Sequence, residues 1–284
     1  MADGHVYGTT YGKPYGKSYG RAGRACCALL AGGLFLAGCS GGGGDGGKPG
    51  GAKTTSDAKP PTSAAPPTPT GFAFTPDPAK APETRADAKR LALAIVAGPD
   101  SWGPDYVKRE PYLSVEDSWP VLPADCRWES TDLPPTVLYT VTSHSEIPAA
   151  GGKGLARVTA TVTVHRSADD ADWEMSETLE EALRCPDQTL RQGERISGLL
   201  SLGNPGIGSN ITAQDSINEL GKYINDSVKG EHYYGWSQSR IGQVTVAASV
   251  KGGPGHTDKA LNTSMAQALV AMLNRVLAEL EVQS

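Results

Sequence analysis

The residues most suggestive of ligand chemistry are five consecutive ones, His232-Tyr233-Tyr234-Gly235-Trp236. Aromatic side chains with polar tips often line ligand clefts, because the ring packs against apolar groups while its tip hydrogen-bonds. Successive side chains of a strand face opposite ways, so His232, Tyr234 and Trp236 would share one face. We predict these three as ligand-binding residues. The alternative is that their rings close the hydrophobic core.

No familiar catalytic or metal-binding pattern accompanies this segment. The histidines outside residues 1–20 lack the spacing of metal ligands and are expected at the surface: His144, His165, His232 and His256. No Gly-x-Ser-x-Gly sequence offers a serine nucleophile. A run of acids lacks the 12-residue calcium-loop pattern and suits the first turn of a helix: Asp169, Asp170, Asp172 and Glu174. We therefore expect no enzyme activity, no metal and no cofactor.

Three segments alternate apolar and polar residues with the period of a half-buried strand. They are residues 155–165, 243–251 and 136–142. In the first, valines and alanine alternate with Arg157 and a series of threonines, and the role of this threonine-rich face is left open.

Three further segments carry apolar residues at helical spacing. They are residues 84–97, a helix that begins after Ser167 and runs to about Arg184, and residues 258–281. Helices and strands without a regular β-α-β rhythm predict an α+β domain. We expect a mainly antiparallel sheet with flanking helices, including a long C-terminal one.

Cys126 and Cys185 are the only cysteines after residue 39. An even pair in an exported domain predicts one disulfide, which closes a loop of about 60 residues and stabilises the fold by about 4 kcal/mol. The alternatives are two buried free thiols or a redox pair, although the two cysteines are not in a Cys-x-x-Cys arrangement.

The N-terminal region has the pattern of an export signal. Four basic residues precede a 14-residue apolar stretch, residues 25–38, which is too short to span a bilayer. The sequence Leu36-Ala37-Gly38-Cys39 resembles the lipobox of bacterial lipoproteins. That resemblance implies cleavage before Cys39 and a diacylglyceryl group on its thiol, whose two acyl chains give stable membrane anchoring. A plain secretory signal and a short buried helix are the alternatives.

Composition divides the chain into three regions. Residues 1–38 form the signal peptide with a low-complexity Tyr-Gly N-terminus, 39–83 a disordered Gly/Pro/Ser/Thr tether, and 84–284 the extracellular domain. Removing four of the 26 basic residues and one of the 31 acids changes the net charge from −5 to −8. This charge argues against a nucleic-acid partner and against tight binding to anionic lipid. The expected membrane contact is through the lipid anchor on Cys39, and the identity of a ligand or protein partner is left open.

The lipobox, tether and α+β domain together resemble an actinobacterial surface lipoprotein. Arg166-Ser167-Ala168-Asp169-Asp170-Ala171 leads into a helix that ends at Cys185, and strand 243–251 precedes the C-terminal helix. In these patterns residues 84–284 resemble the PknH-like extracellular sensor domain. The resemblance implies a cleft for an unknown ligand, although that family has two disulfides where this chain can form only one.

These patterns predict a lipid-anchored, non-enzymatic binding or sensor-like domain at the outer face of the plasma membrane. A structural or protein-interaction lipoprotein of the envelope is one alternative, and it predicts a large exposed apolar patch. An envelope hydrolase is another. It predicts two convergent polar side chains with strongly perturbed pKa values in a pocket.

Overall fold

An eight-stranded antiparallel sheet organises the part of the chain that the computed structural model describes, residues 72–205 and 212–282. Its strand order is β1-β4-β5-β10-β9-β8-β7-β6, and a ribbon formed by β2 and β3 lies apart from it. The strands are β1 (Val107–Leu113), β2 (Ser118–Val121), β3 (Glu129–Asp132), β4 (Val137–Ile147), β5 (Ala156–His165), β6 (Gln188–Arg191), β7 (Glu194–Pro205), β8 (Asp215–Asn225), β9 (Val228–Ile241) and β10 (Val244–Lys251). The predicted α+β class with an antiparallel sheet is confirmed.

Three α-helices flank the sheet, and each begins at a Ser or Thr cap. They are α1 (Arg85–Ile95), α2 (Ala168–Arg184) and α3 (Asp258–Leu280), with 3-10 turns at Pro78–Lys80 and Pro99–Ser101. The side chains of Thr84, Ser167 and Thr257 each accept a hydrogen bond from a backbone N–H of the first turn. The three predicted helices are confirmed at nearly the predicted bounds.

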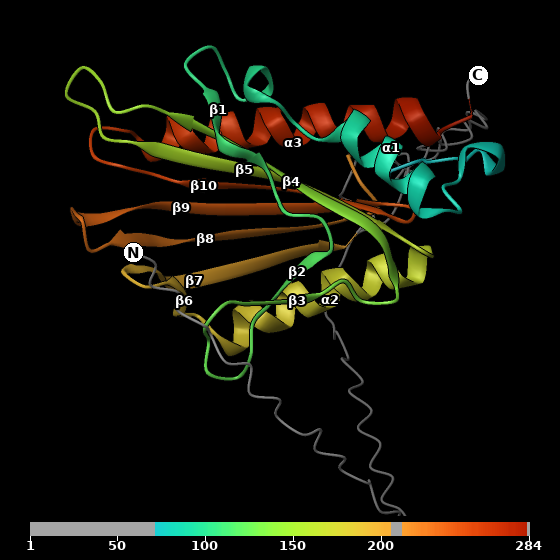
Figure 1. The fold of residues 1–284 in the computed structure, drawn as a ribbon, viewed down its shortest axis with the longest axis horizontal. Helices are drawn as coiled ribbons and strands as arrows, with labels where there is room; N and C mark the ends of the chain where they lie inside the picture. Colours follow the sequence, from blue (N-terminus) through green and yellow to red (C-terminus); the bar gives the residue numbers. More distant parts are fainter. Residues whose placement is uncertain (1–71, 206–211, 283–284) are drawn as a thin grey trace, which may run out of the picture. The chain divides into compact units, whose positions relative to one another are not determined.

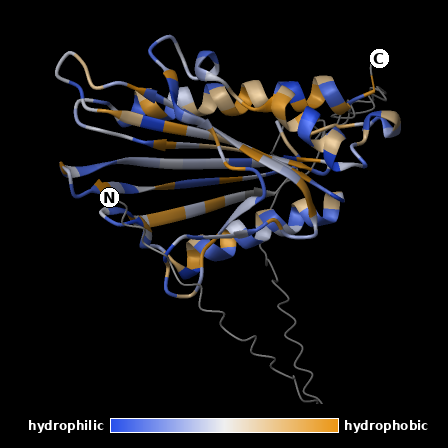
Figure 2. Cartoon of the chain, viewed as in Figure 1, coloured by the Kyte–Doolittle hydropathy of each residue, from blue (hydrophilic) through white to orange (hydrophobic). Residues whose placement is uncertain are grey.

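The main hydrophobic core lies between one face of the sheet and the pair α1 and α3 (Figures 1 and 2). Valines and alanines of β5 and β10 fill this face, and Val158, Val162 and Val246 are all fully buried. From the helices, Ile95, Leu261 and Met272 meet them. The alternation read from the sequence therefore placed the apolar side chains of these strands on the correct face.

The opposite face of the sheet curls around α2, which packs on β7, β8 and β9. A nitrogen of Arg157 on β5 lies 3.3 Å from a carboxylate oxygen of Glu194 on β7. β5 and β7 are four positions apart in the strand order. In a flat sheet, strands four positions apart would be separated by about 19 Å. Only a strongly curved sheet brings them into contact, so this polar face is concave.

The folded domain begins earlier than the predicted residue 84. Phe72 and Phe74 pack against the main core. The backbone N–H of Asp77 donates to the carbonyl of Leu280 at 2.9 Å, close to the end of α3. Residues 72–83, assigned to the tether from composition, thus contact the domain. Cys39 and the predicted signal peptide lie outside the described residues.

Candidate functional site

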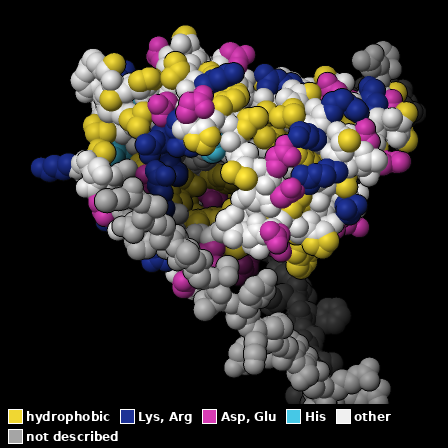
Figure 3. Space-filling view, viewed as in Figure 1, with side chains coloured by type: hydrophobic (Ala, Val, Ile, Leu, Met, Phe, Trp, Pro, Cys, Tyr) yellow, Lys and Arg dark blue, Asp and Glu magenta, His cyan; other side chains and the backbone are white. Residues whose placement is uncertain are grey.

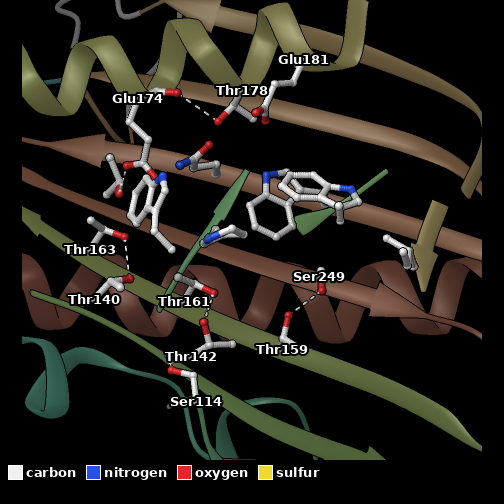
Figure 4. Close-up of a pocket in the computed structure, with 18 of the residues that line it drawn as sticks. Ser114, Thr140, Thr142, Thr159, Thr161, Thr163, Glu174, Thr178, Glu181 and Ser249 are labelled. Carbon is white, nitrogen blue, oxygen red and sulfur yellow. Dashed lines mark hydrogen bonds between the residues drawn. The ribbon is translucent and has the colours of Figure 1, made fainter. Parts of the chain in front are cut away.

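The threonine-rich face of the sheet forms the floor of a cavity. Antiparallel register aligns hydroxyl groups of β4, β5 and β10 in cross-strand pairs (Figure 4). The paired oxygens are 3.0 Å apart in Thr140–Thr163, 2.8 Å in Thr142–Thr161 and 2.6 Å in Thr159–Ser249. This answers the question that the sequence left open: the polar face is turned toward an internal space.

Helix α2 forms one wall of the cavity and is tied to the floor through Glu174. One carboxylate oxygen of Glu174 accepts a hydrogen bond from the Thr245 hydroxyl at 2.6 Å. The same oxygen lies 2.8 Å from Nε2 of His165. The predicted surface position of His165 is wrong, because the residue is only 1 % exposed. A polar face of a strand is usually exposed to solvent, but α2 covers this end of β5.

A cover across the cavity comes from the segment that holds β2 and β3. The Cys126–Cys185 disulfide, confirmed as predicted, joins this segment to the end of α2. Arg184 donates to the carbonyls of Leu122 and Pro123 in the same region. The indole N–H of Trp128 donates to Oε1 of Gln188 at 2.8 Å. The disulfide therefore holds a tryptophan-bearing cover over the threonine floor.

Two of the three predicted ligand-binding residues line the cavity. Tyr234 and Trp236 lie on β9 and face it, together with Trp119 and Trp128 from the cover. The third residue, His232, pairs with Tyr223 in the register of β8 and β9 and lies outside the cavity lining. Tyr234 also belongs to a small apolar cluster with Ala182 and Leu199, so the rings serve both packing and lining.

Trp119 and Trp128 could not be predicted as lining residues, because each is an isolated aromatic residue in a segment without clear periodicity. For Glu174, Thr178 and Glu181 a signal exists. Their spacing of four and three residues places them on one face of a helix, and all three line the cavity (Figure 4).

The cavity has a volume of about 410 Å³, which suits a small organic molecule. Figure 3 shows the molecule hollowed on this face, with hydrophobic and acidic side chains visible inside and Lys/Arg side chains beside the opening. Among the lining residues, Nε1 of Trp236, Oε1 of Gln238 and Oε1 of Glu219 are buried without a hydrogen-bond partner in the described protein. Such atoms are available to a polar ligand.

Two carboxyl groups in the cavity have raised pKa values. Burial raises the pKa of Glu219 to about 7, and the nearby charge of Glu181 adds to the shift. Burial likewise raises the pKa of Glu181 to about 7, opposed by a hydrogen bond from the Leu122 backbone. Near neutral pH each carboxyl can therefore be protonated and donate a hydrogen bond.

Within residues 72–205 and 212–282, no three His, Cys, Asp or Glu side chains are grouped as a metal site. The acids near the start of α2 have other contacts. The Asp170 carboxylate accepts from the Ser167 hydroxyl at 2.7 Å. Asp172 forms an ion pair with Arg240 at 3.2 Å.

Comparison with solved structures found similarity to the crystal structure of the extracellular domain of PknH from Mycobacterium tuberculosis. It is 14 % identical, with a TM-score of 0.47, and the match covers 72 % of this chain and all of that one. No protein-family model matches the sequence. No curated protein matches it either.

Proposed function

We propose that this chain is a lipid-anchored, extracytoplasmic and non-enzymatic binding or sensor-like domain, whose cavity holds a small organic ligand. The export signal, the lipobox at Cys39 and the Cys126–Cys185 disulfide support the location, since disulfides persist in oxidising compartments. No described helix is both long and apolar enough to cross a bilayer. Attachment in this proposal comes from the lipid on Cys39.

The observation that carries the binding proposal is the lining of the cavity. Three tryptophans supply apolar surface: Trp119, Trp128 and Trp236. The threonine floor and the unpartnered polar atoms supply hydrogen-bonding groups at the same place. A ligand pocket typically combines a mainly apolar wall with a few fixed polar groups, and this cavity has that composition.

Ligand binding is tested by extracting small molecules from the full chain purified from its native membrane. Ala247 lies on the cavity floor between Thr161 and Gln238, so an Ala247→Trp side chain would occupy the cavity. Val270→Trp, at an exposed position of α3, is the matched control. We expect one compound in wild type and control, and its loss in Ala247→Trp. Equal recovery from all three proteins, or from none, would contradict the proposal.

The anchor is tested by intact-mass spectrometry of the same preparation. We expect a chain that begins at Cys39 and carries a diacylglyceryl group, and a Cys39→Ser variant that lacks it. A wild-type mass without lipid would contradict anchoring while leaving the cavity proposal intact.

A hydrolase is the second candidate, favoured by the carboxyl groups of Glu181 and Glu219 in one cavity. General acid–base catalysis requires one group that gives and one that takes a proton, and a useful pair has pKa values pushed apart. Burial raises the pKa of both Glu181 and Glu219 to about 7, so the two values are not separated. This favours a ligand-binding cavity over a hydrolase. Incubating the extracted compound with trace protein decides between the two. Conversion that is lost in Glu219→Gln would establish the hydrolase, and an unchanged compound supports binding.

The protein-interaction alternative finds support on the outer face of β7 and β8. Leu200, Leu202 and Leu220 are 60, 58 and 45 % exposed there, and Leu200 pairs with Leu220 across the strands. Three leucines form a small patch by comparison with protein interfaces. Cross-linking in native membranes with wild type and Leu200→Glu would reveal a partner that depends on this patch.

A further inference from the structure

A group of basic side chains lies beside the cavity, gathered by the curl of the sheet. They come from strands at both edges and the middle: Arg109 on β1, Arg157 on β5, Arg191 on β6 and Lys251 on β10. All four line a side cavity of about 170 Å³. This side cavity shares His144, Thr159, Leu190, Ser249 and Lys251 with the main cavity. Figure 3 shows Lys/Arg side chains gathered next to the hollow.

Acidic residues only partly balance this basic group. The carboxylate of Glu194 contacts three of the cations: Arg157 at 3.3 Å, Lys251 at 4.0 Å, and Arg191. Arg109 has no ion pair within the described residues, and the nearest opposing charges are Glu146 and Glu194. Four cations therefore face two carboxylates, which leaves a net positive charge.

Burial and mutual repulsion lower the pKa values of two basic groups in this cluster. Burial lowers the pKa of Lys251 to about 8; Glu194 opposes that shift, and the three arginines add to it. Burial, then the charges of Arg109 and Lys251, lower the pKa of His144 to about 4. An anion placed among these groups would offset the cost of burying their positive charges and would reduce their mutual repulsion.

Hydrogen-bonding capacity is also unused at this place. Nε of Arg109, Nε of Arg157 and Nδ1 of His144 are buried and have no hydrogen-bond partner in the described protein. Buried polar groups are normally paired, so three such atoms around one small cavity indicate a partner outside the protein. Arginine favours oxyanions, because its fork of N–H donors matches two oxygens.

We infer that the ligand carries an oxyanion, a carboxylate or a phosphate, bound among Arg109, Arg157 and Lys251, while its remaining part extends into the main cavity. This inference rests on the proposed binding function and specifies its ligand class. The apolar part would lie against Trp236 and Leu190, which line the main cavity next to Lys251 and Ser249.

Isothermal titration with defined probes tests the inference. The probes are octanoate, octyl phosphate, octan-1-ol and inorganic phosphate. Octan-1-ol presents the apolar chain without an anionic head group, and inorganic phosphate presents the anion without the chain. We expect the two octyl anions to bind at least about tenfold more tightly than octan-1-ol and than inorganic phosphate, with affinity falling as salt rises. Absence of anion binding, or equal binding of octan-1-ol, overturns the inference. Inorganic phosphate that binds as tightly as octyl phosphate overturns the extension into the main cavity.

Arg109→Gln is the sharpest variant, because Arg109 forms no ion pair that its loss would leave unbalanced. We expect about tenfold weaker binding of octyl anions, unchanged binding of octan-1-ol, and partial recovery in Arg109→Lys. Arg195→Gln is the matched control, since Arg195 pairs with Asp226 at an exposed site. Unchanged anion affinity in Arg109→Gln would contradict the assignment.

A failure of these titrations is distinguishable from a failure of the binding proposal. If a compound co-purifies and is lost in Ala247→Trp, yet is neutral and the octyl anions do not bind, the cavity remains a ligand site and only the oxyanion is excluded. If neither experiment finds a ligand, the proposed function itself falls.

Discussion

The buried carboxyl of Glu219 makes the stability of the domain depend on pH in a defined direction. Glu219 is 6 % exposed on β8, and burial raises its pKa to about 7 from an ordinary value of 4.5. The folded state therefore binds this proton more tightly than the unfolded state does. The contribution of Glu219 to the free energy of unfolding is therefore fully present below about pH 4.5 and is lost as pH rises through 7.

The size of this effect follows from the shift. One pKa unit corresponds to 1.36 kcal/mol, so the rise from 4.5 to about 7 amounts to about 3 kcal/mol above pH 7. Glu219→Gln keeps the shape of the side chain and removes its titration. The variant should be close to wild type in stability at pH 4.5 and more stable by up to about 3 kcal/mol at pH 8.

Urea unfolding of both proteins at pH 4.5, 6, 7 and 8, with the disulfide oxidised, measures this difference. Glu231→Gln is the control, because Glu231 is exposed on the neighbouring strand β9. Its stability should follow wild type at every pH. A constant gap between wild type and Glu219→Gln across this range would refute the reasoning, since it would mean that the carboxyl is not desolvated in the folded chain.

Three further variants test the cover of the cavity, the cap of α2 and the main core. Replacing Cys126 and Cys185 together by Ser should lower the unfolding free energy by about 4 kcal/mol and speed hydrogen exchange in residues 118–132, because this cover loses its link to α2. Ser167→Ala removes the cap of α2 and should cost about 1 kcal/mol in urea unfolding. Met272→Ala opens a cavity in the main core and should cost about 2–5 kcal/mol, read from the thermal midpoint and denaturant unfolding together.

Each of these has a result that would contradict it. Unchanged exchange at residues 118–132 in the double cysteine variant would mean that the cover holds without the disulfide. If Ser167→Ala lowers the free energy of unfolding no more than an exposed Ser→Ala change does, the Ser167 side chain does not stabilise α2 as a cap. A Met272→Ala protein as stable as wild type would mean that α3 does not pack as described.

The elements of the fold were readable from the sequence because their signals are local. Alternating residues in 155–165 and the cap at Ser167 each specify a strand or a helix without reference to distant parts of the chain. The even pair of cysteines likewise restricted the disulfide to Cys126–Cys185.

The cavity could be predicted only in part, because it depends on curvature and on a cover. The alternation of β5 separates its two faces, but a polar face looks the same whether it meets water or an internal space, and so His165 was placed wrongly. Trp119 lies in β2 beside a proline, where no periodicity marks a strand. The convergence of Arg157 and Glu194 arises from sheet curl over four strands, which no local pattern encodes.

Native mass spectrometry of the full chain, purified from its own membrane, shows whether the cavity holds a ligand. We expect wild-type protein with one small molecule bound, and an Ala247→Trp variant, its cavity filled at β10, without that added mass. Wild-type protein with no added mass, or a variant that retains the molecule at full occupancy, would contradict the claim that this cavity is the ligand site.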